Sequence, residues 1–345
     1  MRFAGVFVAG CVSLSACGGE APTATQRGAV TYAEYCAPCH GQELEGYAAD
    51  NANALSNSNF LSLATDAFLR DAVIYGRPGT PMSGWGEARA GPLSDADVDD
   101  VVAFVRSYQA TPSQEVHGDT VEGIATKGQA VWSAAKCDEC HGDYGQGGAV
   151  ALSVNNPWFL ATASDGYLRQ SIREGRPGTT MQGFEGVLGE IEIGDLVALI
   201  RSWQVPVDDT PLPPFTPTFD PSRDIQNLGG GPPSWSLKDD RFIGVDAVKA
   251  ALDEGREMII LDARAHSDFV DGHITGAVSI PFYDLEVVLD DLPEDVWIVN
   301  YCGCPHTVSG LSFDALAQAG FSNIAVLDEG YYVWESLGYP TNQGE

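Results

Sequence analysis

Two stretches of the chain bring two thiols and an imidazole close together: Cys36-Ala37-Pro38-Cys39-His40 and Cys137-Asp138-Glu139-Cys140-His141. Cys-x-x-Cys-His is the pattern of covalent c-type haem attachment, in which the thiols add to the vinyl groups and the histidine ligates the iron. A thioredoxin-type redox pair does not need the histidine, and a zinc site needs a second ligand pair nearby. The pattern therefore predicts two covalently bound haem c groups. Their thioether cysteines are Cys36, Cys39, Cys137 and Cys140, and their histidine ligands are His40 and His141.

The two motifs lie in a repeat of about a hundred residues, so the same structural unit should occur twice. Each copy contains an opening helix, the haem motif, a loop-rich stretch and a closing segment of helical apolar periodicity, at residues 97–108 and 192–203. Ser94, with Asp97 three residues on, is expected to cap the first closing helix. Its buried face is predicted to consist of Val98, Val101, Val102 and Val105.

This order of elements resembles the class I cytochrome c family, in which a loop methionine ligates the iron opposite the histidine. The resemblance implies two all-α domains, with Met82 opposite His40 and Met181 opposite His141. The chain has only four methionines, and these two each follow the same Arg-Pro-Gly-Thr turn. A methionine that merely filled a gap in a core would not recur at one offset.

Filled axial positions determine the expected chemistry. A thioether opposite a neutral imidazole favours Fe(II), and no open position remains for a substrate, so each haem should transfer electrons. Arg77 and Arg176 either pair with haem propionates or are exposed turn arginines. His117, in the polar stretch 111–120, is expected to face solvent.

The net charge of −30 argues against binding to nucleic acid or to anionic lipid headgroups. It either steers basic protein partners or simply keeps the protein soluble. At the N-terminus, a short apolar run follows Arg2 and ends at Leu14-Ser15-Ala16-Cys17, which resembles a bacterial lipobox. The resemblance implies a lipoprotein signal peptide over residues 1–16 and a lipid anchor on Cys17; the alternative is an ordinary secretory signal. Either one predicts export to the periplasmic side of a bacterial membrane.

The remaining domain boundaries follow from composition. Residues 17–27 should form a flexible tether, residues 28–112 and 113–205 the two haem domains, and residues 206–240 a linker. This linker is rich in Pro and Gly, and we expect it to bury no core. Residues 241–345 should form the last domain.

In this last domain, strands alternate with helices, which predicts a parallel α/β sheet. Segments 260–264 and 269–277, the pair Tyr301-Cys302 and the tail 320–340 resemble the rhodanese family. In that family Asp262, Arg264 and His273 would be structural polar residues. The strands are expected at residues 258–261, 278–280, 296–300 and 324–327, and the main helices at residues 246–254 and 309–319.

The rhodanese resemblance implies that Cys302 is the sulfur-carrying thiol. Its loop departs from the family pattern, because it contains no Arg or Lys, Pro305 lacks an N–H donor, and Cys304 adds a second thiol. Three alternatives stay open. The loop is a sulfur or dithiol redox site, a soft-metal site of Cys302, Cys304 and His306, or an inactive fold retained for docking. His306 either activates a neighbouring thiol or is an ordinary loop residue.

The sequence thus predicts a multidomain, exported dihaem cytochrome with two all-α domains and an α/β rhodanese-like domain. Its partners should be periplasmic redox proteins, basic cytochromes among them, and not nucleic acid. We expect electron transfer to be coupled to oxidation of a small inorganic sulfur compound at Cys302, with Cys304 and His306 assisting. The alternative is an electron carrier whose rhodanese-like domain is catalytically inactive.

Overall fold

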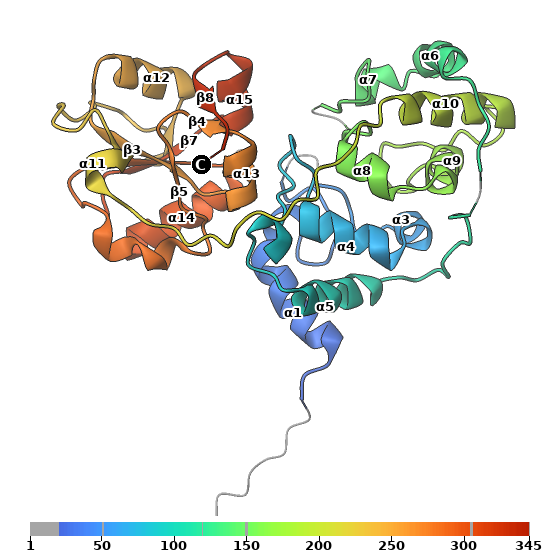
Figure 1. Cartoon of the computed structure of the whole chain (residues 1–345), viewed down its shortest axis with the longest axis horizontal. Helices are drawn as coiled ribbons and strands as arrows, with labels where there is room; N and C mark the ends of the chain where they lie inside the picture. Colours follow the sequence, from blue (N-terminus) through green and yellow to red (C-terminus); the bar gives the residue numbers. More distant parts are fainter. Residues whose placement is uncertain (1–20, 50–51, 119, 149–150, 304–305, 345) are drawn as a thin grey trace, which may run out of the picture.

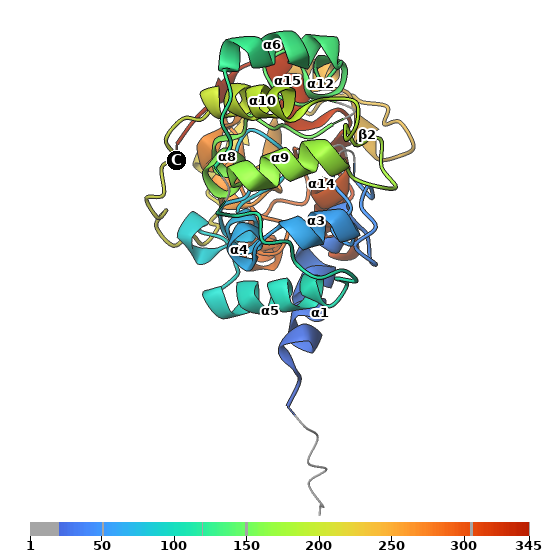
Figure 2. The same cartoon turned by 90° about the vertical axis from the view of Figure 1, so that its right-hand side faces the viewer.

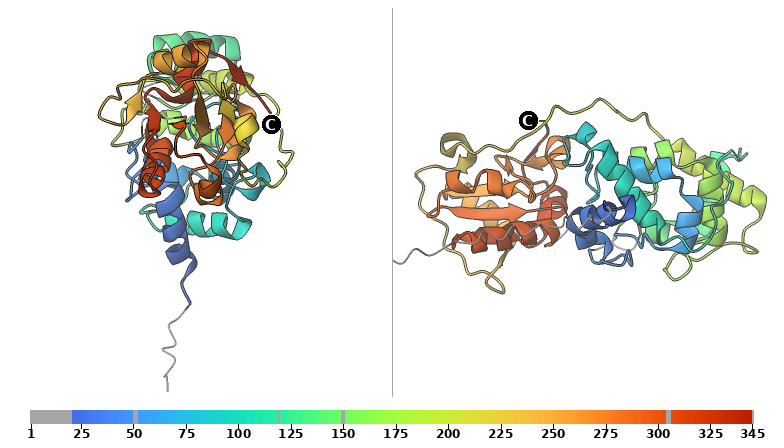
Figure 3. Two further views of the ribbon diagram at one scale, coloured as in Figure 1. Left: turned by 90° about the vertical axis from the view of Figure 1, so that its left-hand side faces the viewer. Right: turned by 90° about the horizontal axis from the view of Figure 1, so that it is seen from below.

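The computed structural model describes residues 21–49, 52–118, 120–148, 151–303 and 306–344. The predicted signal peptide, Cys17, Cys304 and Pro305 lie outside the described residues. Two helical units precede an α/β unit (Figure 1), as predicted. The first helical unit lies between the other two in the view from below (Figure 3) and shares apolar clusters with both.

The helical units repeat one plan. Ser94 caps the closing helix of the first unit, where it accepts from the Asp97 N–H while the Asp97 carboxylate accepts from the Ser94 N–H, as predicted. The four predicted valines are buried, and both closing helices begin two residues earlier than expected. The first unit contains α1 (Ala24–Tyr35), α2 (Ala37–His40), α3 (Ser58–Leu63), α4 (Asp66–Tyr75), a 3-10 turn (Glu87–Arg89) and α5 (Asp95–Arg106). The second contains α6 (Ala125–Ala134), α7 (Asp138–His141), α8 (Pro157–Thr162), α9 (Asp165–Glu174) and α10 (Glu190–Ser202).

In each unit the opening helix crosses the closing helix at a glycine. A Cβ placed on Gly28 would lie 1.8 Å from the Asp100 carbonyl oxygen, and one on Gly128 would lie 2.1 Å from that of Asp195. Any larger residue would therefore push the two helices apart. This close crossing explains why the same glycine occurs in both repeats.

The two helical units pack against each other with pseudo-twofold symmetry (Figure 2). Asn57 donates to the Pro177 carbonyl at 2.9 Å, and Asn156, its counterpart, donates to the Pro78 carbonyl at 2.9 Å. Phe68 stacks on its own counterpart, Tyr167, with ring centroids 5.1 Å apart. The loops that precede the two predicted methionine ligands therefore lie at the contact between the units.

The α/β unit contains the predicted parallel sheet. Its strand order is β1-β3-β6-β7-β2, and β5 pairs in parallel with β3 on the same edge as β1, farther along the strand. Only β1 is antiparallel among these described strands. The strands are β1 (Ile225–Gln226), β2 (Phe242–Ile243), β3 (Met258–Asp262), β5 (Val278–Ser279), β6 (Trp297–Tyr301) and β7 (Ile324–Leu327), and a separate antiparallel pair is β4 (His273–Ile274) with β8 (Thr341–Asn342). The helices are α11 (Pro221–Asp224), α12 (Val245–Asp253), α13 (His266–Asp271), α14 (Thr307–Gln318) and α15 (Gly330–Ser336), with 3-10 turns at Leu285–Val287 and Leu289–Asp291.

The expectation that the linker buries no core is wrong. Phe219 and Ile225 are buried in the core of the α/β unit, and Ile225 belongs to strand β1, which pairs with β3. Further upstream, the Leu212 N–H donates to the Ala88 carbonyl of the first helical unit at 3.0 Å. A Pro- and Gly-rich segment needs only a few apolar residues to be immobilised where an open sheet edge offers hydrogen bonds.

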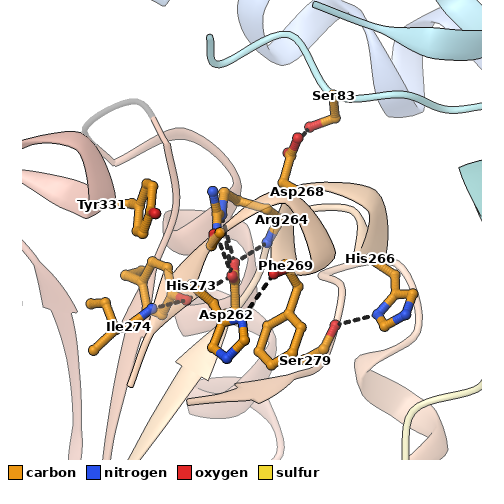
Figure 4. Close-up of polar contacts among 12 residues, drawn as sticks. Ser83, Asp262, Arg264, His266, Asp268, Phe269, His273, Ile274, Ser279 and Tyr331 are labelled. Carbon is orange, nitrogen blue, oxygen red and sulfur yellow. Dashed lines mark hydrogen bonds and ion pairs between the residues drawn. The ribbon is translucent and has the colours of Figure 1, made fainter. Parts of the chain in front are cut away.

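Asp262, Arg264 and His273 are structural, as predicted (Figure 4). Arg264 Nε and Nη2 donate to the two oxygens of Asp262 at 2.9 and 2.6 Å, and the Tyr301 hydroxyl donates to Asp262 at 2.7 Å. Nη2 of Arg264 also donates to the Gly272 carbonyl at 2.6 Å. Asp262 is fully buried and Arg264 is 5% exposed. Each buried charge is therefore neutralised by a partner that is itself held in place.

The α/β unit packs directly on the first helical unit. Ser83, which follows Met82, donates to the carboxylate of Asp268 in α13 (Figure 4), and Arg89 donates to Asp271 at 3.1 Å. Beside these contacts, Tyr35 and Trp85 of the helical unit form an aromatic cluster with Phe282 and Tyr283 of the α/β unit. The ring centroids lie 5.7 to 6.4 Å apart across the boundary. The boundary is thus both apolar and hydrogen-bonded.

We expect Asp262→Ala to lower the free energy of unfolding by about 3–5 kcal/mol, because it leaves the Arg264 charge buried without its partner. Glu254→Ala removes an exposed ion pair with Arg256 in the same unit and should cost less than about 1 kcal/mol. Urea denaturation of both variants measures the difference. Equal losses would contradict a structural role for Asp262.

Asp268 should make stability depend on pH. Burial, with smaller contributions from Asp262 and Asp271, raises its pKa from 3.8 to about 6, although Arg264 and Ser83 oppose the shift. A carboxyl whose pKa is raised by folding stabilises the native state fully below about pH 3.8, and this contribution disappears as the pH rises through about 6. The free energy of unfolding of Asp268→Asn should therefore fall less between these pH values than that of the wild type. Asp290→Asn, an exposed change in the same unit, should follow the wild-type pH profile; a profile of Asp268→Asn that matches the wild type would contradict the prediction.

Candidate functional site

The first haem motif forms the one-turn helix α2 directly after α1. His40 ends this helix, and its Nδ1 is hydrogen-bonded to the Asn53 carbonyl at 2.9 Å. Since a carbonyl can only accept, Nδ1 carries the proton and Nε2 remains as the donor atom for a metal. Burial lowers the pKa of His40, which favours the neutral ring that a metal requires. Burial also raises the pKa of the Cys36 thiol to about 12.

The second motif has the same geometry. Nδ1 of His141 is hydrogen-bonded to the Leu152 carbonyl at 2.9 Å, which again leaves Nε2 available, and burial lowers the pKa of His141. Burial raises the pKa of the Cys137 thiol to about 11. One feature differs: Lys136, with φ of +62°, adds a residue between the opening helix and the motif. The α7 helix carries the motif in place of α2.

Both predicted methionine ligands sit in loops of the same conformation. The Arg77 N–H donates to the Met82 carbonyl at 2.7 Å, and the Arg176 N–H donates to that of Met181 at 2.8 Å. In each loop the threonine hydroxyl of the turn, on Thr80 or Thr179, accepts from the methionine N–H. Each unit thus combines two motif cysteines, a histidine with Nε2 available and an ordered methionine loop, a donor set that fits haem c.

Of the two alternatives for the turn arginines Arg77 and Arg176, the exposed one does not hold, since both side chains are half-buried. Burial lowers the pKa of Arg77 to about 10, and its guanidinium lies 5.5 Å from the centre of the Phe68 ring. Arg176 donates to the side chains of Asn59, Tyr167 and Ser171, and Asn59 belongs to the other helical unit. Arg176 therefore helps to join the two units; pairing with propionates stays a prediction. His117 is exposed, as expected.

The two haem motifs differ sharply in exposure. Cys36 is 8% and His40 is 7% exposed, whereas Cys140 is exposed and His141 only half-buried. In addition, α14 of the α/β unit packs against α2 of the first motif. No domain covers the second motif in the same way among the described residues.

Cys302 lies at this same boundary. It follows β6, is 1% exposed, and its Sγ lies 3.1 Å from the Ser309 hydroxyl in the first turn of α14. It belongs to one apolar cluster with Ala49 of the first helical unit, and Cys39 of the haem motif packs against this cluster. The positive end of the α14 dipole favours negative charge at such a sulfur. The structure therefore brings the predicted sulfur-carrying thiol next to the predicted attachment site of the first haem.

The other two candidate residues of the loop are His306 and Cys304. His306 begins α14 with φ of +74°, and its Nε2 is hydrogen-bonded to Asp328 at 2.7 Å. Cys304 lies outside the described residues, so the proposed metal set is not tested as a whole. Within the described ranges, no group of three or more His, Cys, Asp or Glu side chains is arranged to hold a metal ion. The dithiol, soft-metal and inactive alternatives stay predictions.

Comparison with known proteins agrees with this architecture. The family described as cytochrome c oxidase, cbb3-type, subunit III matches residues 23–105 and 123–200, and the rhodanese-like domain family matches residues 244–337. The cbb3-type oxidase subunit FixP of Azorhizobium caulinodans is 32% identical over 160 residues, which are 45% of this chain and 52% of FixP. An HTH-type transcriptional regulator of Mycobacterium tuberculosis is 32% identical over 91 residues, 26% of this chain and 40% of the regulator.

Among solved structures, the rhodanese-like domain of an Anabaena protein is 30% identical and covers 29% of this chain and 77% of its own, with a TM-score of 0.28. The chain spans about half or less of the length of the two curated relatives above. The matched families cover both haem motifs and Cys302. The chain therefore contains two cytochrome c domains, which imply two covalently bound haems c, followed by a rhodanese-like domain.

Proposed function

We propose that this protein is an exported electron carrier whose first cytochrome domain receives electrons from sulfur chemistry at Cys302. The observation that carries the proposal is the shared cluster of Cys302, Ala49 and Cys39. Electron transfer weakens steeply with distance, so a thiol that packs at a haem attachment site is well placed as a donor. In the proposal, Cys36 and Cys39 hold the first haem and Cys137 and Cys140 hold the second.

In the proposal, His40 with Met82 would hold the iron of the first haem, and His141 with Met181 that of the second. Each haem, when bound, takes up and releases one electron. Other residues of the chain position these ligands. Asn53 and Leu152 orient the histidines through their carbonyl oxygens, and the contact between the two units places the methionine loops together.

The proposed reaction at Cys302 yields an electron pair. Hydrosulfide and the Cys302 thiolate combine to form Cys302–S–S⁻, which forms one S–S bond, releases one proton and yields two electrons. Ser309 and the start of α14 would stabilise the anionic sulfur. The loop contains no Arg or Lys, so a small donor with one negative charge suits it better than thiosulfate. The two haems of the same chain, each of which accepts one electron, could together take up these two electrons.

The proposed location is the periplasmic side of a bacterial membrane, with a lipid anchor on Cys17. This part rests on the lipobox-like Leu14-Ser15-Ala16-Cys17. In the part of the chain that the structure describes, no helix has the length and apolar character needed to cross a membrane. Periplasmic redox proteins, including basic cytochromes, are the proposed partners, since the chain carries a net charge of −30.

One observation favours a second candidate function. Cys302 is only 1% exposed beneath the first cytochrome domain, so a substrate has little direct access to it. In this alternative the rhodanese-like domain is catalytically inactive and serves as a cap on the first haem site. The rhodanese-like domain would then act only by packing on the first cytochrome domain, through the aromatic cluster and the hydrogen bonds of Asp268 and Asp271.

Cys302→Ser distinguishes the two functions. In the haem-loaded protein, we expect hydrosulfide to reduce the haems at least about tenfold more slowly after this change, because the sulfur nucleophile is gone. Stopped-flow absorbance measures the rate, and reduction by ascorbate serves as the control that should not change. The serine keeps a hydroxyl beside Ser309, so the loop should fold. If hydrosulfide reduces wild type and variant equally fast, or reduces neither, the cap function is supported instead.

A further inference from the structure

The second cytochrome domain carries an open hollow of about 520 Å³ beside its haem motif. It lies between α6 and the segment that follows Met181. Ala135, at the end of α6, and Gln182, directly after Met181, both line it. The hollow therefore adjoins both the attachment motif and the methionine loop of the second haem, and it belongs to neither Cys302 nor the first haem.

The internal repeat shows what covers the equivalent surface of the first domain. Phe184, which lines the hollow, corresponds to Trp85, because their N–H groups donate to the equivalent carbonyls of Ile172 and Val73. Trp85 packs in the first domain against Phe282 and Tyr283 of the rhodanese-like domain, at 6.3 and 6.2 Å between ring centroids.

Two further lining residues of the hollow also correspond to first-domain residues that contact the rhodanese-like domain. Ala135 corresponds to Tyr35, whose ring centroid lies 5.7 Å from that of Tyr283. Gln182 corresponds to Ser83, which donates to Asp268 of the rhodanese-like domain. These positions contact protein side chains in the first domain, so the hollow lies outside the space of the haem itself.

The surface of the hollow has the composition of a protein contact. Val187, which lines it, is 73% exposed, and Ile191, next to the lining residue Glu192, is 77% exposed. Exposed apolar side chains that gather at one place commonly mark an interaction surface. The domain around them, residues 113–205, has twelve acidic and six basic side chains. The domain as a whole, together with Glu192 in the lining of the hollow, therefore favours a positively charged partner.

We propose that this hollow docks a basic redox protein, which inserts apolar side chains there as Phe282 and Tyr283 do on the first domain. The first haem site is covered by the rhodanese-like domain, whereas the second motif is open, so exchange with an external protein occurs at the second domain. A second copy of this chain is disfavoured, because its Phe282 and Tyr283 already pack on its own first domain. The proposal rests on electron transfer through the second haem and not on the chemistry of Cys302.

Val187→Lys tests the docking site, and Val30→Lys is its matched control. Val30 is 69% exposed on α1, so both variants lose an exposed valine and gain one positive charge. The probe is a basic class I cytochrome c, titrated in the ferric state into the full-length, haem-loaded, ferric protein in a calorimeter. We expect Val187→Lys to raise Kd by at least about tenfold and Val30→Lys by no more than about twofold. After reduction with ascorbate, the second-order rate of electron transfer to the probe should fall in the same order.

The design separates local contact from overall charge, since both variants change the net charge equally. Equal weakening in the two variants would overturn the proposal, because net charge alone would then explain binding. No binding of the probe to the wild type would also overturn it. The proposal would also be overturned if the wild type self-associated and Val187→Lys abolished this self-association. A second copy of the chain would then be the occupant of the hollow. Failure of hydrosulfide to reduce the haems would leave this test unaffected, because ascorbate supplies the electrons.

Discussion

The contact between the Met82 loop and α13 determines how the three domains work together. Ser83 is the residue after Met82, and its hydrogen bond to Asp268 ties the predicted ligand loop to the rhodanese-like domain. The aromatic cluster around Trp85 buries apolar surface beside that bond. Burying the Asp268 carboxyl away from water is costly unless it is hydrogen-bonded, and the Ser83 hydroxyl supplies such a bond at this boundary. The same boundary also holds Cys302 next to Cys39.

The same contact makes the two cytochrome domains unequal. Their backbones share the glycine crossing, the histidine hydrogen bond to a carbonyl and the methionine loop, so the repeat preserves what a haem site requires. Their outer surfaces have diverged, since Tyr35 and Trp85 of the first domain correspond to Ala135 and Phe184 of the second. In the first domain the larger side chains pack on the rhodanese-like domain of the same chain. In the second domain the smaller ones line a hollow. The equivalent face of the duplicated domain is therefore covered within the chain in the first copy and open in the second.

How much the sequence predicts depends on the range of the interactions. The haem motifs, the Ser94 cap, the valine face of α5 and the strands of the parallel sheet are local patterns, and all of these elements appear. The burial of Phe219 and Ile225 was not predicted, because it depends on an open edge at β3 that only the folded sheet provides. Asp268 and Tyr35 were missed for the same reason: nothing in their neighbouring sequence indicates that a second domain covers them. The motif residues could be assigned from spacing, whereas the position of Cys302 relative to a haem site required the structure.

The enclosure of Cys302 has two opposite effects on the sulfur chemistry proposed there. Close packing on Ala49 and Cys39 favours electron transfer, yet it also limits what can reach the sulfur. A diatomic anion such as hydrosulfide needs far less space than thiosulfate and brings only one charge into a loop without Arg or Lys. Enclosure and charge therefore select the same kind of donor. A larger, doubly charged substrate would have to separate the two domains first, which means breaking the Ser83–Asp268 hydrogen bond and exposing Trp85, Phe282 and Tyr283 to water. The cost of that opening rises with the apolar area exposed, so in the proposed function the contact that brings the thiol to the haem site would also restrict the size of a substrate.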